Sequence, residues 1–239
     1  MSERFFLAAP PHDGRAVLTG DEARHLVRVL RARVGDEVCV FAGTGVEWPA
    51  RIVQIGRDEV ELDVGAARPD AVEGPPLVLA VALPKGERQK WLVEKLTELG
   101  VARLVPLVTA RGVAEATPAA LARLRRTVIE ASKQCGRNTL LEVAAPATPA
   151  ELFARLDPGT WAFVADPAGP PLVTIPRPVA VGGMLALVGP EGGFTSEEVA
   201  AAVAAGSTRA SLGPHVLRIE TAAIAAAAAL SCLARTHDA

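Results

Sequence analysis

The residues with the clearest chemical potential form a glycine-rich turn, Val188-Gly189-Pro190-Glu191-Gly192-Gly193. An apolar run of strand length, Met184 to Val188, precedes the turn, and Thr195 with Glu198 forms a capping-box pattern that begins a helix after it. In α/β folds, a turn between a buried strand and a helix N-terminus is where ligands bind, and glycine lets them approach the backbone. The sequence therefore predicts a ligand-binding turn. The alternative is a β–α turn that uses glycine only for its backbone dihedrals.

The composition of the turn limits the chemistry of its ligand. It matches neither the G-x-G-x-x-G spacing nor the Walker pattern with Lys and Ser/Thr. Glu191 carries a carboxylate that would repel a phosphate attracted to the helix N-terminus. These features disfavour a nucleotide with phosphates and favour a neutral or cationic ligand such as a sulfonium.

Four further segments accompany the turn in a recognisable order. They are Asp21-Glu22-Ala23-Arg24-His25-Leu26-Val27-Arg28-Val29-Leu30-Arg31, then Pro84-Lys85-Gly86-Glu87-Arg88 with Glu94-Lys95-Leu96-Thr97-Glu98-Leu99-Gly100, then Glu130-Ala131-Ser132-Lys133-Gln134-Cys135-Gly136-Arg137-Asn138, and Leu217-Arg218-Ile219-Glu220-Thr221-Ala222. With them the chain resembles, almost end to end, the RsmE family. These are bacterial SPOUT-superfamily methyltransferases that methylate N3 of a uridine in 16S ribosomal RNA.

The resemblance implies an α/β fold. Its C-terminal part would be a SPOUT-type, trefoil-knotted, parallel-sheet methyltransferase domain, and its N-terminal part a small PUA- or OB-like β-barrel. In that superfamily three C-terminal loops form the S-adenosylmethionine pocket, and the enzyme is a homodimer with its sites at the subunit interface. The cofactor-binding residues implied here are Val188, Gly189, Pro190, Glu191, Gly192, Gly193, Leu212, Gly213, Leu217, Arg218, Thr221 and Ala222.

Parts of the pocket rim depart from the family pattern. A loop after the strand Phe163-Val164-Ala165 would close one side, but Asp166-Pro167 stands there in place of the usual His-Pro step. His215 and Ile219 also occupy positions where other residues are typical.

The implied reaction is attack of uracil N3 on the sulfonium methyl group. Because uridine N3–H is a weak acid, the enzyme must remove its proton or stabilise the developing anion. Arg218 or Arg137 could place positive charge at O2 or O4, and Glu191, Glu220 or His215 could accept the proton. We therefore expect Arg218, Glu220 and Arg137 to be catalytic. The alternative for Arg218 and Glu220 is a structural ion pair near a helix start.

Composition sets the class of protein and its compartment. The chain has 239 residues, of which 50% are hydrophobic and 22% charged, which is typical of a globular protein with one large or two modest domains. No signal peptide or apolar run of about eighteen residues is present, which predicts a cytoplasmic protein with no membrane span. Cys39, Cys135 and Cys232 lack disulfide or zinc-ligand spacing, so we expect no metal.

Two domains are expected from the change of pattern along the chain. Residues 1–70 contain short strand candidates at Val38–Phe41, Trp48–Ile55 and Glu59–Val64. One short helix, Asp21–Leu30, is expected between them and the N-terminus, with Leu26, Val29 and Leu30 on one apolar stripe. Residues 68–76 have the composition of a linker. Residues 75–239 alternate strand and helix, which predicts a mainly parallel sheet covered by helices. The expected strands are 77–83, 103–108, 161–165, 184–188 and 210–212, and the expected helices are 87–99, 119–134, 149–156, 196–205 and 221–234.

RNA contact is expected at clusters of basic residues, although the net charge is −2. The first cluster includes Arg24, Arg28 and Arg31 on the short helix; the alternative is an ordinary solvated helix face. The expected partner is 16S ribosomal RNA within the 30S subunit. Two other functions stay open: another SPOUT specificity such as 2′-O-ribose methylation, and a non-catalytic RNA-binding assembly factor.

Overall fold

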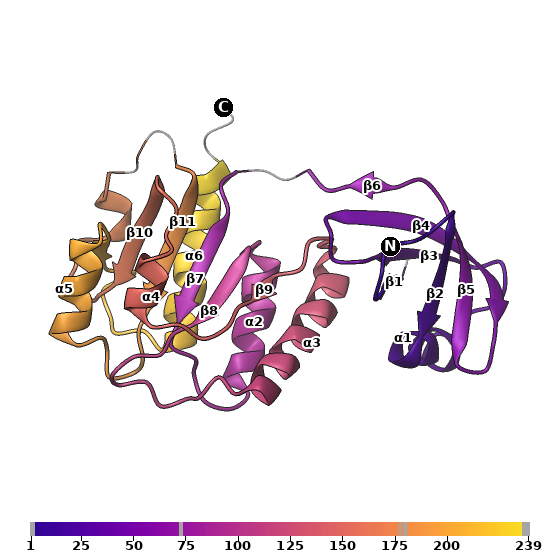
Figure 1. Cartoon of the computed structure of the whole chain (residues 1–239), viewed down its shortest axis with the longest axis horizontal. Helices are drawn as coiled ribbons and strands as arrows, with labels where there is room; N and C mark the ends of the chain where they lie inside the picture. Colours follow the sequence, from indigo (N-terminus) through magenta and orange to yellow (C-terminus); the bar gives the residue numbers. More distant parts are fainter. Residues whose placement is uncertain (1–2, 72–73, 177, 179–180, 236–239) are drawn as a thin grey trace. The chain divides into compact units, whose positions relative to one another are not determined.

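The computed structural model describes residues 3–71, 74–176, 178 and 181–235 of the chain, which forms two compact units. The first unit comprises residues 1–72 and 129–140, and the second comprises residues 73–128 and 141–239. Each unit has its own sheet and its own buried core (Figure 1).

The first unit is a curled, six-stranded sheet with a short helix. Its strands have the order β1-β3-β4-β5-β2, and β6 pairs with β4. Alternating burial follows from the period of two along β2, β3 and β5, whose inward residues form the core around Phe5, Val40 and Leu62. The elements are β1 (Arg4–Phe6), β2 (Arg15–Thr19), α1 (Gly20–Arg24), η1 (His25–Val29), β3 (Glu37–Phe41), β4 (Val46–Ile55), β5 (Glu59–Val64) and β6 (Arg68–Pro69).

The short helix differs from its sequence prediction. It begins as α1 but continues as a π-helix, η1, so its turns widen after Arg24. Leu26 is buried as expected, whereas Val29 is 64% exposed and Leu30 is 36% exposed. The prediction of one buried stripe was therefore wrong for Val29 and Leu30, because the wider π-turn breaks the 3.6-residue period on which it rested. The predicted linker is also partly strand, since β6 pairs with β4.

Residues 129–140 contribute side chains to the first unit, although chain order alone places them in the second. Lys133 Nζ lies 2.8 Å from Glu22 Oε1 and 5.8 Å from the centre of the Phe5 ring. Asn138 is buried; its amide nitrogen donates to Asp70 Oδ1 and its oxygen accepts from Arg4. This segment is one of the motifs that carry the family resemblance, and its polar residues are used here for packing within the first unit.

The second unit is a six-stranded parallel sheet with the order β12-β10-β11-β7-β8-β9. The predicted parallel α/β architecture is confirmed. The central strands are apolar throughout, as expected for strands covered on both faces. The elements are β7 (Leu77–Val81), α2 (Arg88–Glu98), β8 (Arg103–Pro106), α3 (Pro118–Cys135), β9 (Glu142–Val143), α4 (Pro149–Phe153), β10 (Thr160–Ala165), η2 (Leu172–Thr174), β11 (Gly183–Val188), α5 (Ser196–Ala204), β12 (Thr208–Ala210) and α6 (Ile219–Arg235).

Helices cover both faces of this sheet. On one face α6 packs against β7 and β11, and α2 packs against α6; α4 and α5 lie against each other on the other face (Figure 1). Ala223, Ala226 and Ala227 of α6 are completely buried. Since alanine has no side chain beyond Cβ, this face of α6 can approach the central strands closely. The alanine-rich sequence is thus explained largely by packing within the chain itself.

A search of the described residues for a helix long and apolar enough to cross a membrane finds none.

Candidate functional site

A pocket of about 630 Å³, counted with its open mouth, lies at the carboxyl ends of β10 and β11 in the second unit. The segment that connects β12 to α6 completes its wall. Carboxyl ends of parallel strands are the usual ligand-binding edge of an α/β sheet. The lining residues are Ala165, Asp166, Pro167, Val188, Gly189, Pro190, Glu191, Gly193, Phe194, Leu212, Gly213, His215, Val216, Leu217, Ile219 and Ala222.

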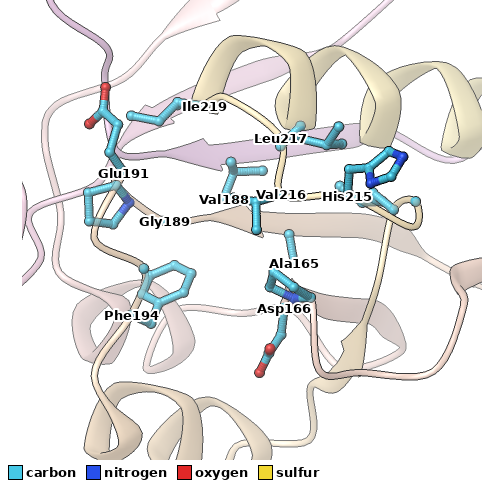
Figure 2. Close-up of a pocket in the computed structure, with 16 residues that line it drawn as sticks. Ala165, Asp166, Val188, Gly189, Glu191, Phe194, His215, Val216, Leu217 and Ile219 are labelled. Atoms are coloured by element: carbon cyan, nitrogen blue, oxygen red, sulfur yellow. The ribbon is translucent and has the colours of Figure 1, made fainter.

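The middle of the pocket is apolar and its edges are polar. Figure 2 shows Val188 and Val216 in the middle, with the carboxylates of Glu191 and Asp166 at opposite edges and pointing away from it. The Asp166 carboxylate accepts from Arg209 Nε at 2.8 Å and from the backbone N–H of Ala168 at 2.9 Å. A flat apolar ligand with polar ends fits such a lining.

The glycine turn has the backbone geometry that its sequence predicts. Gly193 has a φ of +69°, a conformation that side chains with a Cβ rarely adopt, and its N–H donates to the carbonyl of Pro190 at 2.8 Å. After the turn, the predicted capping box is confirmed: Thr195 and Glu198 each accept from the other's backbone N–H, at 3.2 and 2.8 Å. The turn is therefore fixed at its helical end before any ligand binds.

A second anchor for the turn is an arginine that sequence reasoning missed. Arg111 Nη1 donates to the carbonyl of Gly192 at 2.8 Å and to that of Phe194 at 3.4 Å. A Cβ on Gly192 would meet Cδ of Arg111 at 3.3 Å. Gly192 therefore faces its anchor, and it is not among the residues that line the pocket.

A second missed arginine links two of the three predicted loops. Arg88, at the start of α2, places Nη2 3.5 Å from Glu191 Oε1 and Nη1 3.6 Å from Glu220 Oε2. Glu220 is buried, with 5% of its surface exposed, and its Oε2 atom has no hydrogen-bond partner. The sequence signal for Arg88 was its place in the Pro84–Arg88 motif, but no spacing rule pointed to these carboxylates.

The structure brings most of the predicted cofactor residues together. Val188, Gly189, Pro190, Glu191, Gly193, Leu212, Gly213, Leu217 and Ala222 line the pocket, whereas Gly192, Arg218 and Thr221 do not. Arg218 and Thr221 are exposed. Both rim departures, His215 and Ile219, line the pocket, as does the expected closing segment of Ala165, Asp166 and Pro167.

The predicted catalytic residues fall in different environments. Glu220 lies buried between two pocket-lining residues of the chain, Ile219 and Ala222, and contacts Arg88. Arg137 belongs to the first unit, where burial lowers the pKa of its guanidinium while Cys135 and Asp70 act in the opposite direction.

The arginines predicted to contact RNA are exposed on the first unit. Arg24 and Arg28 lie on α1 and η1, and Arg31 follows with a φ of +56°. Arg24 pairs with Asp21 of its own helix. Exposed Val29 and Leu30 lie between Arg28 and Arg31 in the chain, so this exposed segment carries both cationic and apolar side chains.

Comparison with known proteins assigns both units. Residues 72–231 match the model of the RNA methyltransferase domain, and residues 18–65 match that of the RNA methyltransferase PUA domain. Among curated relatives, a Synechocystis protein named "Ribosomal RNA small subunit methyltransferase E" is 32% identical over 92% of this chain and 74% of its own. A Mycobacterium bovis protein of the same name is 32% identical over 98% of this chain and 93% of its own.

Solved structures agree with these relatives. A Neisseria gonorrhoeae ribosomal RNA small subunit methyltransferase E bound to S-adenosyl methionine is 30% identical and superposes with a TM-score of 0.89, covering 98% of both chains. A methyltransferase from Legionella pneumophila with bound SAM is 29% identical and has a TM-score of 0.87, again over 98% of both chains.

The fold and the pocket thus define an RNA methyltransferase with a PUA domain. The predicted fold class, a SPOUT-type parallel-sheet domain with a small N-terminal β-domain, is confirmed. Within that class, the chain belongs to the ribosomal RNA small subunit methyltransferase E family.

Proposed function

We propose that this protein transfers a methyl group from S-adenosylmethionine to N3 of a uridine in 16S ribosomal RNA. The observation that carries the proposal is the apolar pocket at the ends of β10 and β11, where a phosphate-binding cradle is replaced by a turn containing Glu191. Relatives named as small-subunit rRNA methyltransferases support the same chemistry, and two similar methyltransferase structures, one of which carries that name, contain bound S-adenosylmethionine.

The residues of the pocket fit S-adenosylmethionine. Apolar side chains such as Val188 and Leu217 suit an adenine ring, and the glycines leave backbone groups open to its polar edge. The polar side chains at its two edges, Asp166 and Glu191, are carboxylates and not phosphate-binding groups, so the rim disfavours a ligand with phosphates. When bound, the cofactor supplies an electrophilic methyl group on a sulfonium, whose departure leaves a neutral thioether.

Proton transfer from uracil is assigned to Glu220. Its carboxylate is buried, and Oε2 lacks a hydrogen-bond partner, so it can accept the N3–H proton while the N3 electron pair forms the bond to the methyl carbon. Arg218 is proposed to place positive charge at O2 or O4 of the developing anion, and Arg137 is the alternative source of that charge. Glu191 is less suited as the base because its carboxylate points away from the middle of the pocket (Figure 2), and its Oε1 lies 3.5 Å from Arg88 Nη2. His215 lines the pocket and is the alternative base.

Capture of the RNA is assigned to the first unit, through Arg24 and Arg28 on the short helix and Arg31 just after it. The unit matches the PUA domain of RNA methyltransferases, and the arginines are exposed. We further propose that the enzyme is a homodimer that acts on RNA within the 30S subunit in the cytoplasm. Residues 75–239 would carry methyl transfer and residues 1–70 RNA binding, with residues 129–140 packed in the first unit.

The product decides between this function and its alternatives. Purified protein is incubated with labelled S-adenosylmethionine and either 30S particles or free 16S RNA, and the RNA is digested to nucleosides for mass spectrometry. We expect 3-methyluridine. A 2′-O-methylnucleoside would instead identify a ribose methyltransferase, and absence of any methylated nucleoside on both substrates would favour a non-catalytic assembly factor.

A further inference from the structure

One side chain connects the start of α2 to two separate parts of the pocket wall. Arg88 is 38% exposed and contacts Glu191, which lines the pocket, and Glu220, whose side chain is 7% exposed. Both contacts, at 3.5 and 3.6 Å, are longer than an ordinary hydrogen bond. The guanidinium therefore stands between two carboxylates, in charge contact with each.

The contact between Arg88 and Glu220 differs from a surface ion pair because the carboxylate of Glu220 is buried. A carboxylate withdrawn from water is costly unless a cation compensates its charge. Arg88 supplies that cation from α2, and the partly exposed Glu191 shares it. Besides α2, the strands β7 and β11 pack against α6, and both strands consist of apolar residues. Arg218, two residues before Glu220, is exposed. Among the described residues, Arg88 is the cation in charge contact with both Glu220 and Glu191, so its loss would leave the two carboxylates without it.

We propose that Arg88 is a positioning residue for methyl transfer: it joins the glycine turn to the first turn of α6 and holds the buried carboxylate of Glu220 in place. The inference rests on the proposed function, because it assigns to Glu220 the N3 proton. Arg88 itself takes no part in bond making. Its planar guanidinium contacts two carboxylates through different nitrogens, whereas the single ammonium nitrogen of a lysine is less suited to bridge them.

Two consequences distinguish positioning from simple structural support. Loss of Arg88 should remove the link between the glycine turn and α6, and should therefore weaken the binding of S-adenosylhomocysteine. This binding can be measured in the absence of RNA. Loss of Arg88 should also leave the buried carboxylate of Glu220 without its cation, so that the proton acceptor is no longer held in place. Methyl transfer should then be slow even when the cofactor site is saturated.

The test compares Arg88→Met and Arg88→Lys with the matched control Arg103→Met, which removes an arginine from a surface ion pair with Glu142 in the same unit. Calorimetry with S-adenosylhomocysteine should show at least about tenfold weaker binding for Arg88→Met, partial recovery for Arg88→Lys and no change for the control. The single-turnover rate at saturating S-adenosylmethionine should also fall at least about tenfold in Arg88→Met and recover in part in Arg88→Lys. The double variant Arg88→Met/Glu220→Gln should regain binding, because it no longer buries an uncompensated charge, but not turnover.

The outcomes separate this inference from the proposed function. If Arg88→Met binds S-adenosylhomocysteine and transfers the methyl group as the wild-type protein does, or if the double variant binds no better than Arg88→Met, the positioning role is refuted. If the wild-type protein itself fails to bind S-adenosylhomocysteine, the proposed function is refuted first. Circular dichroism of each variant checks that the fold is retained.

Discussion

Substitution of Gly213 offers a direct test of what the pocket binds. Gly213 lines the pocket, its backbone lies outside the left-handed region, and a Cβ added there has no heavy atom within 4 Å. Valine at this position should therefore leave the unliganded fold intact, with a change in the free energy of unfolding within about 0.5 kcal/mol. Its side chain would instead occupy space that the ligand needs.

The size of the effect follows from linkage between binding and unfolding. At a ligand concentration of 100 times Kd, binding stabilises the native state by about 2.7 kcal/mol. For a chain of this size that corresponds to a rise in Tm of roughly 5–11 °C, from about 2–4 °C per kcal/mol. If Gly213→Val raises Kd about 100-fold, the same ligand concentration contributes only about 0.4 kcal/mol, or a rise of about 1 °C.

Thermal unfolding with and without S-adenosylhomocysteine measures both quantities at once. Gly182→Val is the matched control, because Gly182 is exposed, lies outside this pocket in the same unit, and would place its Cβ 3.8 Å from the nearest atom. We expect ligand to raise the Tm of the wild-type and control proteins by roughly 5–11 °C and that of Gly213→Val by only about 1 °C. A full ligand-induced shift in Gly213→Val would show that the ligand lies elsewhere.

Three further outcomes are expected. Burial and the nearby charge of Glu47 raise the pKa of the Cys39 thiol from 9.0 to about 11, so its thiolate at pH 8 should be about 100-fold scarcer; iodoacetamide mapping should label exposed Cys135 and Cys232 first, and equal rates would contradict this. Substitution of Arg24, Arg28 and Arg31 by Glu should weaken RNA binding and make it less dependent on salt concentration, while S-adenosylhomocysteine binding persists. An unchanged salt dependence would show that these arginines are ordinary surface charges. Light scattering should give about twice the chain mass of 24.8 kDa, and a monomer that still methylates RNA would refute the dimer.

The sequence predicted the second unit well because its signals are local. Continuous apolar runs mark the central strands, and Thr195 with Glu198 marks the start of α5 by a bond pattern that spans three residues. The short strands β1 and β2 escaped prediction because their stability comes from pairing with β3 and β5. The same reason explains why the site residues Arg88 and Arg111 were missed. Their roles depend on contacts with carboxylates and carbonyls that lie far away in the sequence.

The position of residues 129–140 bears on how this protein could be altered by recombination. Because Lys133 and Asn138 take their partners from Glu22, Arg4 and Asp70, the first unit is assembled from two stretches of chain that are not consecutive. A cut at residue 75 would therefore separate these partners. A chimera that exchanges only the N-terminal stretch between relatives would pair it with residues 129–140 of a different protein. A chimera that also exchanges residues 129–140 would transfer the complete first unit.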